Sequence, residues 1–195
     1  MISHERKFIF IHVPKTAGCS ITSQLRNPKG GRHPSWGHRR LSSTLKNNSE
    51  CTGYLKFTFV RNPWDRAVSA FHYMQKGGAH NKWDNKDHKK YFSKPQSFQE
   101  FIKSDNFNTV VINQQHFKAM TYYLDGGFDF IGRFENLQGD FDTMCDKIGM
   151  PKQTLPHKNK SNHKHYTEYY DEETKQIVAE KYAKDIEVFG YEFGE

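Results

Sequence analysis

The chain has 195 residues, of which 35% are hydrophobic and 15% aromatic, so it is too apolar for a disordered chain and predicts one globular domain over residues 1–195. The formal net charge of +7 favours acidic partners such as nucleotides, phosphates, sulfated glycans or nucleic acid. Three scattered cysteines argue against a disulfide framework or a zinc site. With no secretory signal and no apolar run of about 20 residues, we expect a cytoplasmic protein without a membrane span.

The first predicted element is a strand over Phe8–Val13, a short and nearly continuous apolar run. Such runs are typical of strands that are buried on both faces of a parallel sheet. Pro14 ends the run, a loop over 15–18 follows, and helical spacing begins at Ser20.

A second strand and helix follow the same pattern. Tyr54–Val60 is the strand, Asn62 is a helix cap, and Pro63 takes the first helical position. The apolar residues then recur at helical spacing, and Gly77-Gly78 ends the helix. That stripe consists of Trp64, Ala67, Val68 and Phe71.

Residues 75–96 are polar and rich in lysine, without a period, and predict a solvated surface loop. The alternative is a mobile flap over an anionic acceptor. Ser97 and Glu100 form a capping box that predicts a short helix directly after this segment.

The remaining chain predicts a third strand over 129–132 and two more helices. One helix has an apolar face from Leu137 to Ile148, and the last starts near Asp171 and continues through Ile186. Strands that alternate with helices predict an α/β fold, a three-layer sandwich with a mainly parallel central sheet.

The segment from His12 to Ser20 follows the carboxyl end of the first strand and opens a helix, which predicts an anion site. Lys15 supplies a positive charge, and Thr16 and Ser20 supply hydroxyl donors. The lysine precedes Gly18, unlike the lysine of the nucleotide-triphosphate P-loop, and no Walker-B aspartate is apparent. The alternative is a simple strand–helix turn with a solvated lysine.

Arg61 is predicted at the end of the second strand, on the same sheet edge as Lys15, where a guanidinium suits a phosphate. Ser69 lies off the apolar stripe of the next helix, which leaves its hydroxyl free for a ligand. The alternatives are an ion pair between Arg61 and Asp65 and an ordinary solvated position for Ser69.

Together these segments resemble the PAPS-dependent sulfotransferases, specifically the Golgi carbohydrate sulfotransferases and their bacterial relatives (PAPS is 3′-phosphoadenosine 5′-phosphosulfate). The matching segments are the PKTAG loop, FVRNPWDR with Ser69, FIGRFENLQGDF over 130–141, and the pattern from LPHKNKS to the C-terminal FGYEF. They cover almost the full chain in order. The resemblance implies a P-loop-like sulfotransferase fold and transfer of a sulfuryl group from PAPS to a hydroxyl.

The resemblance also implies roles for individual residues. Six consecutive residues would bind the 5′-phosphosulfate: Lys15, Thr16, Ala17, Gly18, Cys19 and Ser20. Arg61 and Ser69 would bind the 3′-phosphate, and Ser161, Lys160 and Arg133 are further nucleotide contacts. The family usually has Thr or Ser at the position of Cys19, so the contact that a side-chain hydroxyl would make with the donor is missing here. A solvated loop for Lys160 and a sheet-edge ion pair for Arg133 stay open as alternatives.

For the chemistry we expect in-line attack by the acceptor oxygen, with Lys15 neutralising charge on the bridging oxygen. His38, 23 residues before Arg61, resembles a catalytic histidine of the family and is the predicted general base, with His33 as the second choice. A solvated histidine is the alternative. No metal is expected, because lysines lie between the histidines of the C-terminal cluster at 157, 163 and 165.

Two rival functions stay open at this point. A nucleotide kinase or phosphotransferase would use the same sheet edge, and a nucleic-acid-binding module would suit the charge and the aromatic residues among basic ones. The acceptor is predicted to be a glycan, without nucleic-acid partners, and the oligomeric state is not indicated.

Overall fold

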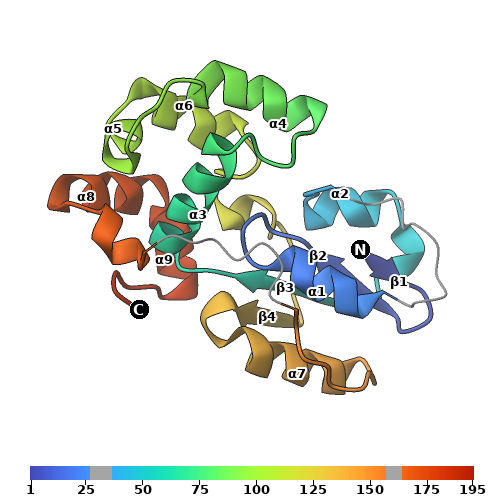
Figure 1. Cartoon of the computed structure of the whole chain (residues 1–195). Coiled ribbons are helices and arrows are strands. Elements are labelled where there is room, and N and C mark those ends of the chain that lie inside the picture. The colour runs from blue at the N-terminus through green and yellow to red at the C-terminus, as the bar shows by residue number, and fades with distance from the viewer. Residues whose placement is uncertain (27–36, 157–163) are drawn as a thin grey trace. The chain divides into compact units, whose positions relative to one another are not determined.

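The computed structural model describes residues 1–26, 37–156 and 164–195 (Figure 1). The chain divides into two compact units, each built from two separate stretches. Unit 1 comprises Met1–Arg61 and Met120–Lys160, and unit 2 comprises Asn62–Ala119 and Ser161–Glu195. The chain therefore passes from one unit to the other three times, and the interpretation as a single domain stays a prediction.

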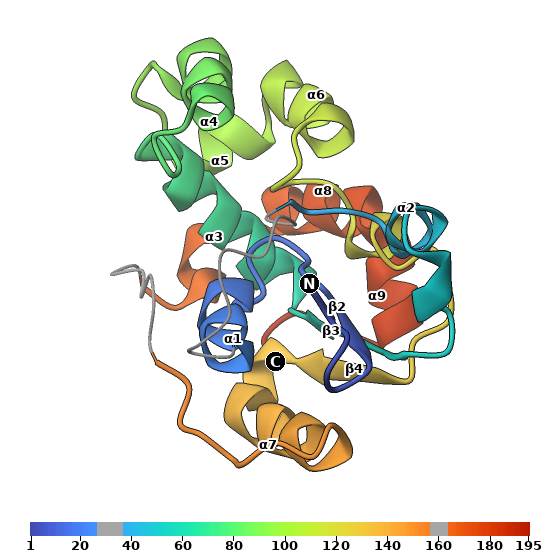
Figure 2. The ribbon, with the colours of Figure 1, turned by 90° about the vertical axis from the view of Figure 1, so that its right-hand side faces the viewer.

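Unit 1 is built on a four-stranded sheet in the order β1-β2-β3-β4. The strands are Ile2–Ser3, Phe8–Ile11, Leu55–Val60 and Phe130–Arg133. β1 is antiparallel to β2, whereas β2, β3 and β4 run parallel. The carboxyl ends of these three strands consequently lie at one edge of the sheet (Figures 1 and 2). The predicted α/β class with a mainly parallel sheet is confirmed.

Helices α1 (Gly18–Leu25) and α7 (Leu137–Lys147) pack on one face of this sheet. Alternate residues of β2 and β3 face them, because successive side chains of a strand point to opposite sides. Each fully buried Phe contributes roughly 1.5–3 kcal/mol through removal of apolar surface from water. The centre of this core consists of Phe8, Phe10, Ile21, Phe57, Phe59, Phe141, Met144 and Cys145.

The remaining elements of unit 1 are short and carry little periodic signal. They are α2 (Leu41–Lys46), η1 (Ser49–Cys51), η3 (Met120–Tyr122) and η4 (Phe134–Asn136). Helix α2 was not predicted, since six residues are too few to show an amphipathic stripe.

Unit 2 is helical, and its first helix, α3 (Pro63–Gln75), confirms the prediction. The Asn62 side chain accepts a hydrogen bond from the Trp64 N–H at 3.1 Å. Helix α5 (Phe98–Ile102) opens with the predicted capping box of Ser97 and Glu100, and α6 (Asp105–Asn113) follows. A cluster of aromatic rings joins these helices: Phe71, Phe92, Phe101, Phe107 and Phe117.

The last predicted helix is interrupted in the structure. After η5 (Tyr166–Tyr169), α8 (Glu172–Lys181) ends at Tyr182 and α9 (Ala183–Phe189) begins. The buried Tyr182 hydroxyl donates to the Phe117 carbonyl at 2.6 Å, so the interruption lies at a residue with a tertiary contact. None of the helices in the described ranges is both long and apolar enough to cross a bilayer.

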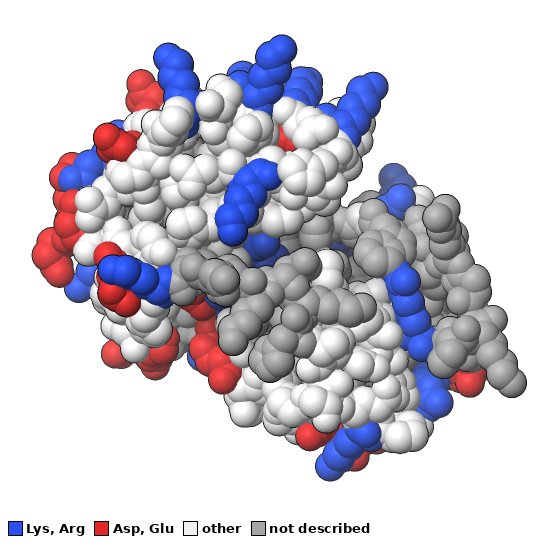
Figure 3. Space-filling view, viewed as in Figure 1, with Lys and Arg blue, Asp and Glu red and all other residues white. Residues whose placement is uncertain are grey.

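The lysine-rich segment predicted as a solvated loop contains two helical elements, which corrects that prediction, while the alternative of a flap stays a prediction. It contains α4 (Lys82–Asp87) and the π-helical turn η2 (His88–Phe92). Asn81 caps α4, and the buried Asp84 carboxylate accepts hydrogen bonds from the Tyr73 hydroxyl and the Ala79 N–H, each at 2.9 Å. Lysine and arginine side chains project from the part of unit 2 that holds α4 and α6 (Figure 3).

Candidate functional site

The loop between β2 and α1 has a backbone suited to anions. Lys15 and Ala17 adopt left-handed conformations, with φ of 68° and 61°, which non-glycine residues rarely do. Such strain concentrates at functional sites, and alternating left- and right-handed residues direct successive N–H groups into a concavity that holds anions. Ala17 is the N-cap of α1 and, as an alanine, offers no side-chain acceptor to the first helical N–H groups. The positive end of α1 is therefore not neutralised by its own cap.

The polar side chains of this loop divide into inward and outward positions. Thr16 is fully buried, and its hydroxyl donates to the Val13 carbonyl at 2.9 Å, so it closes the loop internally. Ser20 is also buried, at 4% exposure, and Cys19 is exposed as a free thiol. Cys19 is thus exposed and Lys15 half-buried, whereas the Thr16 and Ser20 side chains are buried.

Gly18 is required by a close side-chain contact. A Cβ atom at this position would lie 1.9 Å from the His12 ring. The imidazole of His12 therefore lies directly against the start of α1, and it stacks on Phe10 with a centroid separation of 6.1 Å. This contact explains why a glycine stands at position 18, and the role of Gly18 toward the 5′-phosphosulfate stays a prediction.

Arg61 lies where β3 ends, as predicted, and its guanidinium is directed toward the loop. Its Nη1 donates to the Lys15 carbonyl at 3.1 Å, and the guanidinium stands 3.9 Å from the centroid of the Phe134 ring. The side chain is only 7% exposed. Arg61 consequently ties the end of β3 to the anion loop and holds a positive charge beside it.

His38 lies next to the same loop. Its Nδ1 is 2.9 Å from the His12 carbonyl oxygen, and its ring packs edge-on against the His12 ring at 4.6 Å. A carbonyl only accepts hydrogen bonds, so Nδ1 carries the proton and donates. In the neutral imidazole, Nε2 then has the lone pair, which is the tautomer that a general base requires.

Asp125 anchors the segment that carries His38. Its carboxylate accepts from the Ser42 N–H at 2.9 Å and from Arg40 Nε at 2.7 Å, and it also contacts the Ser42 hydroxyl. Burial alone would raise the pKa of Asp125, but the Ser42 hydrogen bonds and the Arg40 charge hold it below its usual value. The Leu41 N–H donates to the Tyr123 carbonyl at 3.1 Å, which adds a second tie to the same segment.

Arg133 ends β4 at the same sheet edge, and its side chain is exposed. Its backbone N–H donates to Asp140 Oδ2 at 2.6 Å, which fixes the end of the strand against α7. Ser69 belongs to unit 2, where it lies on α3 and is 8% exposed. Lys160, Ser161 and His33 lie outside the described residues, so their predicted roles stay predictions.

The comparison with known families is decisive for the class of protein. The model of the sulfotransferase family matches residues 1–192 of this chain. The chain belongs to the sulfotransferase family. An uncharacterised protein of Archaeoglobus fulgidus is 34% identical to this sulfotransferase over 107 residues, which is 52% of this chain and 72% of the relative. No solved structure matches the chain.

Three side chains that contact residues of the candidate site were not predicted from the sequence: His12, Asp125 and Phe134. The histidine lies one residue past β2 and was included only as the start of the loop. The other two act through contacts with residues more than 70 positions away, for which a sequence has no local signal.

Among the described residues, His4, Glu50 and Cys51 form one group of possible metal ligands, with donor atoms within 4.8 Å of one another. Their side chains also contact one another and Tyr54, since Cys51 Sγ lies 3.6 Å from Glu50 and His4 Nδ1 lies 3.1 Å from the Tyr54 hydroxyl. None of them belongs to the predicted site, and a reaction without metal stays a prediction.

Proposed function

We propose that this sulfotransferase uses PAPS as the donor and transfers its sulfuryl group to a hydroxyl of a carbohydrate. The observation that carries the proposal is the loop from His12 to Ser20, with two left-handed residues, a half-buried lysine and the start of a helix in one short segment. Membership in the family supports sulfuryl transfer, and this loop supports an anionic donor.

In this proposal the loop binds the 5′-phosphosulfate through its backbone N–H groups and the Lys15 ammonium. The bond between sulfur and the bridging oxygen breaks, so negative charge grows on the departing phosphate. Lys15 neutralises that charge, the kind of electrostatic stabilisation that contributes most to catalysis. Arg61 holds the loop through the Lys15 carbonyl. Its guanidinium and the Ser69 hydroxyl are the hydrogen-bond donors that we propose for the 3′-phosphate.

His38 is the proposed general base. The acceptor oxygen attacks sulfur while its proton moves to Nε2 of His38, and the product nucleotide leaves as 3′-phosphoadenosine 5′-phosphate (PAP). The hydrogen bond from Nδ1 to the His12 carbonyl supports this role, because it keeps the lone pair on Nε2.

Calorimetric titration of the full chain with PAPS, PAP and ATP with magnesium tests the donor. We expect micromolar binding of PAPS and PAP and much weaker binding of ATP, because the loop lacks the glycine and metal-ligand pattern of triphosphate enzymes. Preference for magnesium ATP would instead support a kinase and contradict the proposal.

Replacement of His38 distinguishes a role in the chemical step from a role in nucleotide binding. His38→Ala is expected to lower kcat by about 10²- to 10⁴-fold while PAP affinity stays unchanged. His80→Ala is a matched control, since His80 is an exposed histidine outside the loop. Wild-type turnover in His38→Ala combined with a loss in His33→Ala would move the base to His33.

A further inference from the structure

Three side chains with metal-binding atoms meet in unit 1. They are His4, in the turn between β1 and β2, and Glu50 and Cys51, which belong to η1. Cys51 Sγ lies 3.9 Å from His4 Nδ1 and 3.6 Å from Glu50 Oε1, and the three donor atoms all lie within 4.8 Å of one another. The sequence does not indicate this group, because His4 and Cys51 are 47 positions apart.

The spacing of these atoms is close to that of a tetrahedral zinc site. Zinc–sulfur bonds of about 2.3 Å and zinc–nitrogen or zinc–oxygen bonds of about 2.0–2.2 Å place neighbouring donor atoms about 3.3–3.6 Å apart. The two distances from Cys51 Sγ therefore differ from a coordinated arrangement by only a few tenths of an ångström. His4 and Glu50 are exposed, so small rotations of their side chains can close that difference.

The chemistry of the three groups favours zinc over magnesium or calcium. Thiolate and imidazole are ligands that zinc prefers, whereas magnesium and calcium are bound by oxygen atoms. A thiolate, a carboxylate and a neutral imidazole together carry two negative charges, which one Zn²⁺ neutralises. The buried Cys51 thiol donates to Glu50 Oε1, so binding of zinc releases the thiol proton to solvent.

Tyr54 lies directly beside the group. Its hydroxyl is 3.1 Å from His4 Nδ1, and the two rings pack edge-on with their centroids 5.8 Å apart. Three protein ligands leave the fourth tetrahedral position to a water molecule or to this hydroxyl. A hydroxyl that donates to Nδ1 also keeps the imidazole proton on Nε2, which is the tautomer in which Nδ1 binds a metal.

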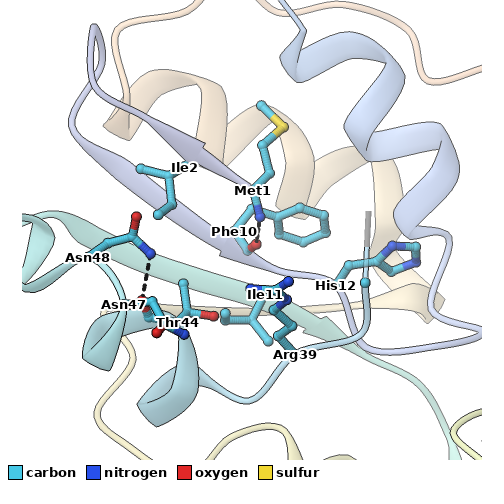
Figure 4. A pocket seen from close by; sticks show the side chains of 10 residues that line it. Met1, Ile2, Phe10, Ile11, His12, Arg39, Thr44, Asn47 and Asn48 are labelled. Carbon is cyan, nitrogen blue, oxygen red and sulfur yellow. Dashed lines mark hydrogen bonds between the residues drawn. The ribbon is translucent and has the colours of Figure 1, made fainter. Parts of the chain in front are cut away.

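The two segments that carry the ligands are held beside each other. Asn48, the N-cap of η1, donates through Nδ2 to the Thr44 carbonyl at 2.8 Å (Figure 4). Ile2 of β1 and Asn48 line one cavity of unit 1 in Figure 4. The Leu55 N–H donates to the Lys7 carbonyl at 2.9 Å, which joins the start of β3 to the turn between β1 and β2. Donor atoms that are already close together lower the cost of binding an ion.

We propose that His4, Glu50 and Cys51 form a structural zinc site of unit 1. His4 precedes β2 and Cys51 precedes β3, so the group lies at the amino ends of two parallel strands. The anion loop follows the carboxyl end of β2. Zinc bound at the amino ends ties two loops together and takes no part in sulfuryl transfer, so this inference is independent of the proposed function.

Cobalt titration of the full chain with reduced thiols tests the ligand set. Co²⁺ occupies zinc sites, and a thiolate ligand gives an intense charge-transfer absorption in the near ultraviolet. We expect one cobalt ion per chain with this band, and we expect zinc to displace it. Cys51→Ala should abolish the band. His4→Ala and Glu50→Gln should each weaken cobalt binding by more than about tenfold, since loss of even an outer-shell partner typically costs 10–100-fold.

His80→Ala is the matched control, because His80 is an exposed histidine of unit 2. The thermal unfolding midpoint of each metal-free variant shows whether it is folded. His4→Ala and Glu50→Gln change exposed side chains, so they test the site even where loss of the buried Cys51 thiol prevents folding. A charge-transfer band that persists in Cys51→Ala, or equal cobalt affinity in the wild type, His4→Ala and Glu50→Gln, would overturn the site.

The structural role predicts a change in stability. At a free zinc concentration about 100 times Kd, the thermal unfolding midpoint of the wild type should rise by about 5–10 °C, and EDTA should reverse the rise. His4→Ala should show no such rise, and PAP affinity should be the same with zinc and with EDTA. Absence of stabilisation by zinc overturns the structural site and leaves the donor assignment intact. A chain that binds zinc but not PAP overturns the proposed function alone.

Discussion

The loop after β2 and the turn before α4 both contain left-handed residues, but only the turn surrounds a carboxylate of the protein itself. The turn before α4 has the left-handed residues Gly77, Gly78 and His80, and its N–H groups and side chains surround Asp84. In the loop after β2 both left-handed residues, Lys15 and Ala17, carry side chains. The turn stabilises unit 2, whereas the loop holds its strained residues where a ligand is proposed to bind.

The largest effect is expected when the ligand-binding loop loses its charge. Lys15→Ala should lower kcat/KM by about 10²- to 10³-fold, comparable with the loss of a single electrostatic contact to a transition state. Steady-state kinetics with PAPS measure it. Lys7→Ala is a matched control, because Lys7 is an exposed lysine with φ of 51° in the turn before β2. An equal loss in both variants would assign the effect to net charge rather than to the loop.

Removal of the internal anion should destabilise unit 2. The Asp84 carboxylate is 1% exposed and accepts hydrogen bonds from Tyr73, Ala79 and Asn81, so Asp84→Asn should lower the free energy of unfolding by about 3 kcal/mol or more. Urea denaturation measures the change. Undiminished stability would show that the carboxylate charge is not needed there.

The same carboxylate predicts how stability depends on pH. Burial alone would raise the pKa of Asp84, but hydrogen bonds from His116, Ala79 and Tyr73 lower it well below its usual value. The stabilisation that ionised Asp84 contributes is therefore fully present well above the unfolded-state pKa of about 3.9, and it is lost as pH falls below that value. Between about pH 5 and pH 3, wild-type protein should lose more stability than Asp84→Asn. Parallel curves for the two proteins would contradict this assignment.

A smaller effect is expected from a methyl group at the turn before α4. Gly78 has φ of 64°, and a Cβ there would lie 2.5 Å from Asp84 Oδ2. Gly78→Ala should lower the free energy of unfolding by about 1–3 kcal/mol through strain and through displacement of the carboxylate. Gly149→Ala is the control, because Gly149 has φ of 62° and open space around it, so it isolates the backbone strain.

The smallest effect is expected from the opposite substitution, alanine to glycine, in the loop after β2. Ala17→Gly removes left-handed strain and should raise the free energy of unfolding by up to about 1 kcal/mol, without tighter PAP binding. Thermal unfolding and PAP titration give the two values. A loss of stability would mean that the alanine side chain packs favourably enough to outweigh the strain.

The regular elements could be predicted because their signals are local. The apolar runs of β2 and β3, the Asn62 cap and the Ser97 capping box were all read from residues within a few positions of one another. The break at Tyr182 and the helices in the lysine-rich segment were not predicted. They depend on the contact of Tyr182 with Phe117 and on the buried Asp84, which sequence patterns do not show.

The candidate site likewise combines features that follow from local sequence with features that depend on tertiary contacts. The positions of Lys15 and Arg61 follow from the order of parallel strands, so the sequence was sufficient to place them at one sheet edge. The inward turn of the Thr16 hydroxyl and the ties from Asp125 to Ser42 and Arg40 depend on tertiary packing. The sequence therefore predicts which residues form the loop but not which of their atoms are exposed to a ligand.

The interleaving of the two units has a consequence for synthesis of the protein. Unit 1 needs β4 and α7, which are synthesised only after the whole of Asn62–Ala119. Until then β3 pairs only with β2, and the N–H and C=O groups of its other side are exposed and favour association with other chains. A nascent chain arrested near residue 119 should therefore depend on chaperones more than one released after residue 160.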